Sequence, residues 1–271
     1  WPNTLASLRE RSVPAVLLNA RMSKKSFGNW KLVKGFAAEL LSTFHLCLAQ
    51  TEADKTRFEA LGAKPVRCVG NLKYAAAPLP YDMNELKAIN EETKGRFLWL
   101  MASTHAGEEE VALKTDRALA ARHPRLLTVI APRHAVRGDE VARKIEAAGL
   151  KYARRSKDER ITEETQVYLA DTIGEMGLFY ALCPITVIGG SFAGTGGHNP
   201  IEPARLGSAI IFGPSMFNFS EIAQEFISEK AAIRLENAGE IASAVDLLWM
   251  DGSGTKTLYP QPDHRRTRPL V

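Results

Sequence analysis

The sequence predicts an α/β protein built on parallel, doubly wound sheets. Short apolar runs rich in β-branched residues alternate with segments of helical periodicity, which is the pattern of repeated βα units. The runs are continuous rather than alternating, as at Ile185–Ile188, and this is typical of parallel strands buried on both faces. Polar turns follow most of these runs. Together the three observations favour parallel strands joined by right-handed crossovers.

A first βα series occupies residues 1–71. A helix is expected over 30–44 from the spacing of its apolar residues, and a second from Thr51, a good N-cap, to Gly62, a good terminator. The strands of this series are expected at 15–18, 45–49 and 66–69.

A second series starts at Arg96, after residues 74–95, whose two prolines and weak periodicity predict a linker. Its strands are expected at 97–103, 126–131, 167–170, 185–188, 209–212 and 232–235, with helices between them and a last helix over 238–249. We therefore divide the chain into the back part of a first domain (1–73), a linker (74–95), a complete second domain (96–250) and an irregular tail (251–271).

The loop after the strand Ile185–Ile188 contains five glycines, which allow a ligand to approach the main chain. Asn199, Pro200 and Glu202 then suit the N-cap, the first helical position and a capping-box acid. A strand, a glycine loop and a helix N-terminus form an arrangement that binds phosphate. Helix capping and a tight connection would explain the same residues. No P-loop pattern is present, and a dinucleotide-binding motif is only weakly supported.

Polar clusters end five of the predicted strands of the second domain. In doubly wound sheets, ligands bind at the carboxyl ends of the strands, so the convergence of these clusters on one rim predicts a nucleotide or anion site. The clusters are STHAGEE (103–109), PRH (132–134), DTIGEMG (171–177), GGSFAGTGGHNPIE (189–202) and FGPSMFN (212–218).

The net charge of +4 is unevenly distributed. Residues 1–71 hold 11 Lys/Arg against 5 Asp/Glu, a net of +6, and the remainder holds 24 against 26, a net of −2. A basic first third indicates an anionic partner or membrane surface, although an ordinary solvated face would look the same. The three cysteines lack CxxC spacing, so no metal site is expected. No apolar window reaches transmembrane length.

Nine short motifs occur in an order and spacing that are specific as a set. They are WPN (1–3), NARMS (19–23), GNLK (70–73), STH with GEE (103–109), PRH (132–134), GEMG (174–177), GGS (189–191), GGHNP with EP (196–203), and FGP with NF (212–219). With these motifs the chain resembles the 3-deoxy-D-manno-octulosonic acid (Kdo) transferases of lipopolysaccharide synthesis. These are GT-B-fold glycosyltransferases that use CMP-Kdo and a lipid A precursor.

The resemblance implies inverting transfer of Kdo from CMP-Kdo, without a metal or other cofactor. Arg133 and the glycine-loop helix end would hold the donor phosphate, Glu202 the ribose, and backbone groups near Arg133 and Met176 the base. The three histidines of the set are either ligands or acid/base groups, or merely structural. The full expected donor-binding set is Ser103, Thr104, His105, Arg133, His134, Gly174, Glu175, Met176, Gly190, Ser191, Gly197, His198, Asn199 and Glu202.

The resemblance also places the catalytic base, a glutamate, upstream of residue 1, so we expect this chain to bind CMP or CMP-Kdo but to be inactive by itself. Arg21, Lys24 and Lys25 are expected to face the acceptor's phosphates or anionic lipid. The expected partners are CMP-Kdo, a lipid A precursor and an anionic membrane surface, with no nucleic acid. The expected location is the cytoplasmic face of the inner membrane.

Two other functions fit the residues. The first is another GT-B enzyme, such as a UDP-sugar transferase or UDP-sugar 2-epimerase, which would prefer UDP to CMP. The second is a non-catalytic nucleotide-binding or scaffold module.

Overall fold

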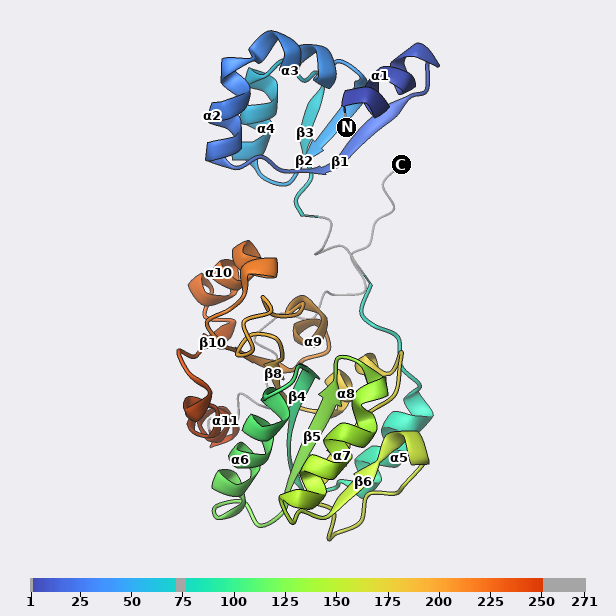
Figure 1. Ribbon diagram of the computed structural model, residues 1–271, viewed down its shortest axis with the longest axis vertical. Coiled ribbons are helices and arrows are strands. Elements are labelled where there is room, and N and C mark those ends of the chain that lie inside the picture. The colour runs from blue at the N-terminus through green and yellow to red at the C-terminus, as the bar shows by residue number, and fades with distance from the viewer. Residues whose placement is uncertain (1, 72–76, 251–271) are drawn as a thin grey trace, which may run out of the picture. The chain divides into compact units, whose positions relative to one another are not determined.

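The computed structural model describes residues 2–71 and 77–250, and the chain divides into two units, Trp1–Ala77 and Pro78–Val271 (Figure 1). Each unit is built on its own parallel sheet, which confirms the predicted α/β class. The predicted tail over 251–271 lies outside the described residues. No helix within the described residues is long and apolar enough to cross a membrane.

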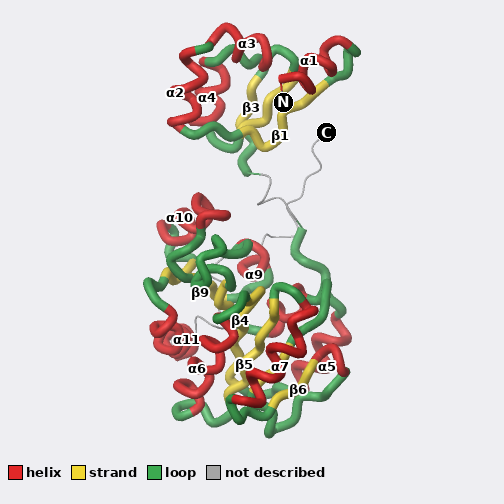
Figure 2. The backbone as a smooth tube through the Cα atoms, viewed as in Figure 1, coloured by secondary structure: helices red, strands yellow, loops and turns green. Residues whose placement is uncertain are grey.

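The first unit has a three-stranded parallel sheet in the order β1-β2-β3 (Figure 2). Phe58 and Cys47 belong to its small core, whereas Val16 and Leu18 of β1 are exposed because they point to the other face of the sheet. The strands are β1 (Ala15–Ala20), β2 (Phe44–Ala49) and β3 (Val66–Cys68). The helices are α1 (Pro2–Glu10), α2 (Lys24–Leu32), α3 (Lys34–Leu41) and α4 (Glu52–Ala60).

The helix predicted over 30–44 is instead two helices, α2 and α3. Helix α2 begins earlier than expected because the Ser23 hydroxyl accepts a hydrogen bond from the Ser26 amide and caps it. It ends at Val33, whose backbone φ of −124° is not helical. The predicted N-cap of α4 is confirmed, since the Thr51 hydroxyl accepts from the Asp54 amide.

The second unit has a seven-stranded parallel sheet in the order β10-β9-β8-β4-β5-β7-β6. Its strands are β4 (Phe97–Thr104), β5 (Leu126–Pro132), β6 (Tyr152–Arg154), β7 (Val167–Leu169), β8 (Ile185–Ile188), β9 (Ala209–Phe212) and β10 (Ala232–Arg234). Its α-helices are α5 (Met83–Glu92), α6 (Glu108–Ala120), α7 (Gly138–Ala147), α8 (Met176–Leu182), α9 (Ile201–Arg205), α10 (Ser220–Ser228) and α11 (Ile241–Met250). Strand β6 was not predicted, because three half-buried edge residues carry little pattern.

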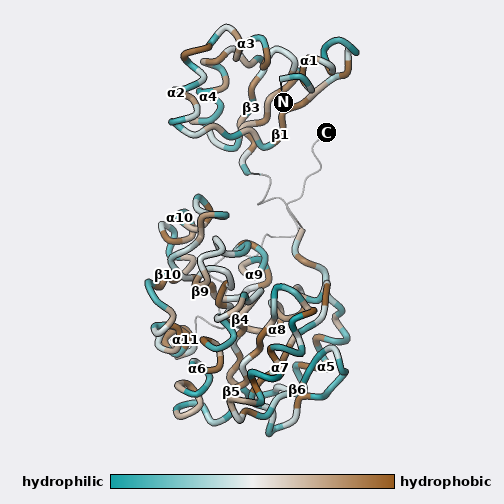
Figure 3. The backbone as a smooth tube through the Cα atoms, in the orientation of Figure 1, coloured by the Kyte–Doolittle hydropathy of each residue, from teal (hydrophilic) through white to brown (hydrophobic). Residues whose placement is uncertain are grey.

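Both faces of this sheet are buried, as the continuous apolar runs predicted. Figure 3 shows the hydrophobic residues of its strands in brown. Successive residues of a strand point to opposite faces, so Trp99 and Met101 of β4 join one core and Leu98 and Leu100 join the other. Helices α6, α7 and α11 cover the first core, and α5 and α8 contribute to the second.

Helix α5 lies inside the segment predicted as a linker, so that prediction is wrong for residues 83–92. Ile89 is 4% exposed and packs in the second core, and Leu86 packs against the same core. The Asp82 side chain caps the helix by accepting from the Asn84 amide. The helix therefore belongs to the second unit, whose boundary falls at Pro78.

The order of the strands creates a topological switch point in the second unit. The chain leaves β4 for β5 on one side and later returns to β8 on the other side of β4. The connections that follow β4 and β8 therefore diverge at the carboxyl ends of these two strands, which is where doubly wound sheets bind their ligands. Two of the polar turns flagged in the sequence follow these strands.

Candidate functional site

Strand β4 ends in a strained turn at the switch point. Ser103 adopts a left-handed backbone with φ of 56°, and the register of β4 on β5 shifts between Ala102 and Thr104. Gly189, at the end of β8, packs against this bulge, since a Cβ placed there would lie 2.4 Å from the Ser103 carbonyl oxygen. The two backbones thus approach as closely as glycine allows. Strain of this kind is typical of functional sites.

Glu108 joins the β4 turn to the glycine loop. Its side chain is buried in the first turn of α6, where the helix dipole favours a negative charge. Its Oε2 accepts from the amides of His105 (2.9 Å) and Gly190 (2.8 Å), and its Oε1 accepts from those of Phe192 (3.1 Å) and Ala193 (3.2 Å). Four amides on one carboxylate fix the loop against β4. The sequence motif flagged this acid but not its role.

The other side of the glycine loop is held by the segment that follows β9. The Ser191 hydroxyl donates to the Ile188 carbonyl and accepts from the Gly213 amide. Ser191 is fully buried. Gly197 has φ of +68°, and a Cβ on it would lie 2.1 Å from the Met216 sulfur. Residues 189–197 are therefore clamped between the β4 turn and the loop after β9.

Two of the predicted donor-binding hydroxyls are turned inward. Ser191 holds the loop as described, and Thr104, also fully buried, donates its hydroxyl to Glu109 Oε1 at 2.7 Å. Arg137 in turn pairs with Glu109 at 2.6 Å. These two hydroxyls therefore support the turns on which other groups stand, and donor binding by Thr104 and Ser191 stays a prediction.

His105 and His198 meet at the switch point. Their Nε2 atoms lie 3.0 Å apart, and their ring planes differ by 6°. Burial first, and then the charges of Arg133, His105 and His134, together lower the pKa of His198 to about 4. The surroundings of His198 therefore disfavour an added cation and favour an anion.

Asn199 and Glu202 carry the loop into helix α9, which starts at Ile201. The Asn199 Oδ1 accepts from the Ile201 amide at 3.2 Å, but the N-cap of α9 is Pro200 and not Asn199 as predicted. Its Nδ2 donates to Glu202 Oε1 at 3.1 Å and orients that carboxylate. Pro200 precedes the five-residue helix rather than opening it.

Tyr180 of α8 joins this group and was not predicted. Burial raises the pKa of its phenol, the negative charge of Glu202 adds to that increase, and a hydrogen bond with Ser103 opposes it. Its position among Ser103, Glu202 and Arg133 has no signal in the sequence, because it lies in an apolar helical segment.

The turn after β7 carries Gly174, Glu175 and Met176. The Glu175 carboxylate accepts from Arg155 at 2.6 Å and from Thr172 at 2.5 Å, and the Arg155 partner lowers its pKa. Glu175 thus holds its own turn. Arg133 and His134 are exposed at the end of β5, and the Arg133 amide donates to the Thr104 carbonyl, which joins that turn to β4.

The structure thus brings one group of predicted residues together at the switch point, and the group is Ser103, His105, Arg133, Gly190, Gly197, His198, Asn199 and Glu202. The predicted acceptor residues Arg21, Lys24 and Lys25 belong to the first unit, where all three are exposed. Within residues 2–71 and 77–250, no cluster of three or more His, Cys, Asp or Glu side chains could hold a metal ion.

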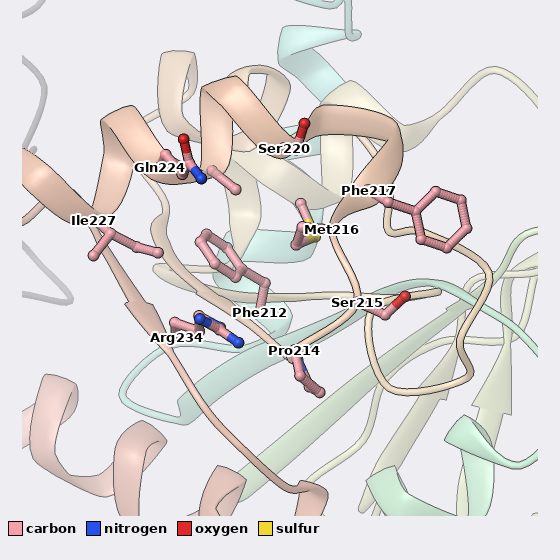
Figure 4. Close-up of a pocket in the computed structure, with 10 residues that line it drawn as sticks. Phe212, Pro214, Ser215, Met216, Phe217, Ser220, Gln224, Ile227 and Arg234 are labelled. Atoms are coloured by element: carbon pink, nitrogen blue, oxygen red, sulfur yellow. The ribbon is translucent and has the colours of Figure 1, made fainter. Parts of the chain in front are cut away.

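A cavity of about 470 Å³ lies next to this group, between the loop after β9 and helix α10 (Figure 4). Its lining is mainly apolar, from Phe212, Pro214, Met216 and Ile227, with Arg234 as its cation. None of the predicted donor residues lines it. We place the site at the switch point because the polar groups converge there.

Replacing Glu108 by Gln tests its role in holding the loop. The amide nitrogen would face two backbone N–H groups that have lost their acceptor, so the free energy of unfolding should fall by about 2 kcal/mol or more. Urea unfolding measures this fall. The control is Glu110→Gln in the same helical turn, a partly exposed acid whose loss should cost less than about 1 kcal/mol. Equal effects of the two variants would contradict the assignment.

Comparison with known proteins gives a consistent result. The family model described as 3-deoxy-D-manno-octulosonic-acid transferase (kdotransferase) matches residues 1–76. The 3-deoxy-D-manno-octulosonic acid transferase of Rickettsia bellii is 33% identical over 258 residues, which are 95% of this chain and 61% of the relative. The Bordetella pertussis enzyme of the same name is 37% identical over 242 residues, 88% of this chain and 56% of that relative. The chain thus spans about three fifths of the length of these curated relatives.

A comparison with solved structures agrees with this result. The C-terminal CMP-Kdo binding domain of WaaA from Acinetobacter baumannii is 31% identical, with a TM-score of 0.60. The match covers 65% of this chain and 97% of that domain. This domain is matched over nearly its whole length, and the family model matches the first unit. The chain therefore belongs to the Kdo transferase family.

Proposed function

We propose that this chain binds the donor in an enzyme that transfers Kdo from CMP-Kdo to a lipid A precursor, in lipopolysaccharide synthesis. The observation that carries the proposal is the meeting of the β4 and β8 turns at the switch point of the second unit, where the His105–His198 pair lies beside Arg133. The 31% identical CMP-Kdo binding domain supports the choice of nucleotide.

The charges of the site suit a nucleotide monophosphate. Arg133 provides a permanent cation beside His198, and the histidine pair provides hydrogen-bonding nitrogens. The Glu202 carboxylate, oriented by Asn199, is the bidentate acceptor we assign to the ribose hydroxyls. Each of these groups stands on a turn that buried partners hold rigid, which keeps the cost of ordering the site small when ligand binds.

The chemistry we propose is direct displacement at the sugar carbon that bears the phosphate. An acceptor hydroxyl attacks that carbon while a carboxylate base removes its proton. The bond from carbon to phosphate oxygen breaks, and its electron pair stays on the departing CMP. Cations and N–H donors at the switch point stabilise the charge that develops there.

Calorimetric titration of this chain with CMP and with UDP tests the donor assignment. We expect saturable binding of CMP that weakens at least about tenfold in Glu202→Ala and in Arg133→Ala, because each loses a contact to a charged group. The matched controls Glu110→Ala and Arg143→Ala remove partly or fully exposed charges elsewhere on the same unit and should bind normally. Binding of UDP in preference to CMP would sink the assignment in favour of another GT-B enzyme.

We also propose that helices α2 and α3 face the acceptor and an anionic membrane surface. Five basic residues and no acidic ones occur from Arg21 to Phe36. Leu32 is 85% exposed and Phe36 49% exposed, and the Lys31 ammonium lies 4.9 Å from the centre of the Phe27 ring. Apolar side chains flanked by lysines are suited to the interface of an anionic bilayer. This surface supports a location at the cytoplasmic face of the inner membrane.

Reversing the charge of Lys24 and Lys25 together tests this surface. Binding to vesicles of phosphatidylglycerol and phosphatidylethanolamine should fall about tenfold or more, because each lysine near an anionic surface contributes ~1 kcal/mol. Co-sedimentation measures the loss. The control reverses Lys87 and Lys114, two exposed lysines of the second unit, with the same change in net charge. If both double variants behave alike, the charge of α2 has no special part in membrane binding.

A further inference from the structure

The contact between His105 and His198 joins segments that are 93 residues apart in the sequence. It exists because β4 and β8 are paired strands whose following turns meet. Glu108 strengthens this proximity, since its carboxylate holds the His105 amide and the start of the loop that leads to His198. The two rings are thus held together by the frame of the site.

A separation of 3.0 Å between two Nε2 atoms requires one hydrogen between them. One ring donates its Nε2–H, and the other accepts with the lone pair of its Nε2. If both rings carried a hydrogen on Nε2, two donors would face each other. The pair can therefore take up one added proton and keep its hydrogen bond. A second added proton would break that bond.

The groups around the pair oppose that added proton when no ligand is bound. Arg133 and His134 approach from the turn after β5, and Arg133 and the burial of His198 both lower the pKa of that ring. Glu202 of α9 and the buried phenol of Tyr180 interact with each other, and Arg133 acts on Tyr180 as well as on His198. Glu108 already accepts four amides. These groups disfavour a positive charge on the His198 ring when no ligand is bound.

We propose that the His105–His198 pair is a proton-coupled subsite for a phosphate dianion, and that it takes up one proton as the dianion binds. This inference rests on the proposed function. When the bond between the sugar carbon and the phosphate oxygen breaks, the electron pair remains on that oxygen, and the phosphate changes from a monoanionic diester to a dianionic monoester. The proton leaving the acceptor hydroxyl goes to the base. A proton from solvent reaches the histidine pair, which then balances the extra charge of the product.

The sign of the linkage follows from charge. A dianion next to the pair favours its protonated form, so the pH midpoint of the pair should rise when the nucleotide binds. Conversely, the affinity for CMP should increase as the pH falls through that midpoint, as long as the phosphate stays doubly ionised. The second ionisation of a phosphate monoester lies near pH 6, so the increase in affinity is expected from about one pH unit above the raised midpoint down to about pH 6.

Nitrogen-15 NMR of the labelled chain, with and without CMP, tests the inference. The chain has six histidines, and the spectra of His105→Gln and His198→Gln assign the pair. In the ligand-free chain at pH 7.5 we expect one Nε2 of the pair to carry hydrogen and the other to lack it. Saturating CMP should raise the midpoint of the pair by about two units or more, within the roughly one to three units that an adjacent opposite charge gives. Cytidine, which lacks the phosphate, should leave it unchanged.

The affinity of variants provides a second readout. His198→Gln should weaken CMP binding about tenfold at pH 6.5 and flatten its pH dependence, since a hydrogen bond to a charged group is lost and no proton can be taken up. His105→Gln provides the same test should His198→Gln fail to fold. The matched control is His45→Gln, an exposed histidine of the first unit.

The outcomes separate this inference from the function on which it rests. If CMP binds and the midpoint of the pair does not move, or both Nε2 atoms carry hydrogen at pH 7.5, the proton-coupled subsite is wrong and the donor assignment stands. If cytidine raises the midpoint as much as CMP, the phosphate is not the cause and the inference again fails. If CMP does not bind, the proposed function and this inference fail together.

Discussion

The second unit depends on one buried carboxylate. Glu108 collects four backbone amides from two segments, and these are the segments that diverge at the switch point of the sheet. A buried carboxylate without partners would be very costly, so the loop must close around it for the unit to fold. Because closure brings the loop against β4, the same interaction places His198 on His105. The hydrogen bonds that hold the loop in the folded unit therefore also hold the histidine pair together.

Several charged side chains at the carboxyl ends of the strands pair with other protein groups and hold the turns in place. Only a few polar groups remain that could contact a ligand. Glu109 is fully buried beneath Thr104 and Arg137, and Glu175 is held by Arg155. Such pairs fix the polar turns as a rigid frame, although buried ion pairs add little net stability. Within that frame Arg133 and the histidine pair retain the character of an anion site.

Elements whose burial leaves a pattern in the sequence could be predicted. Elements and side-chain roles that depend only on tertiary packing could not. Continuous apolar runs predicted the long strands, since strands buried on both faces need such runs. Helix α5 was missed because Leu86 and Ile89 are too few apolar residues to show a period. Ser191 was expected at the ligand, but its hydroxyl is used by backbone groups that only folding brings near. Tyr180 had no local signal at all, and its role follows from its neighbours in space.

A crystal structure of this chain with CMP tests the central claim, that the turns after β4 and β8 form the donor site. The account predicts the phosphate within hydrogen-bond distance of a His105 or His198 ring nitrogen and of Arg133, with the ribose on Glu202. A nucleotide found in the apolar cavity beside α10, or on the β6 side of the rim with no contact to either histidine, would contradict it.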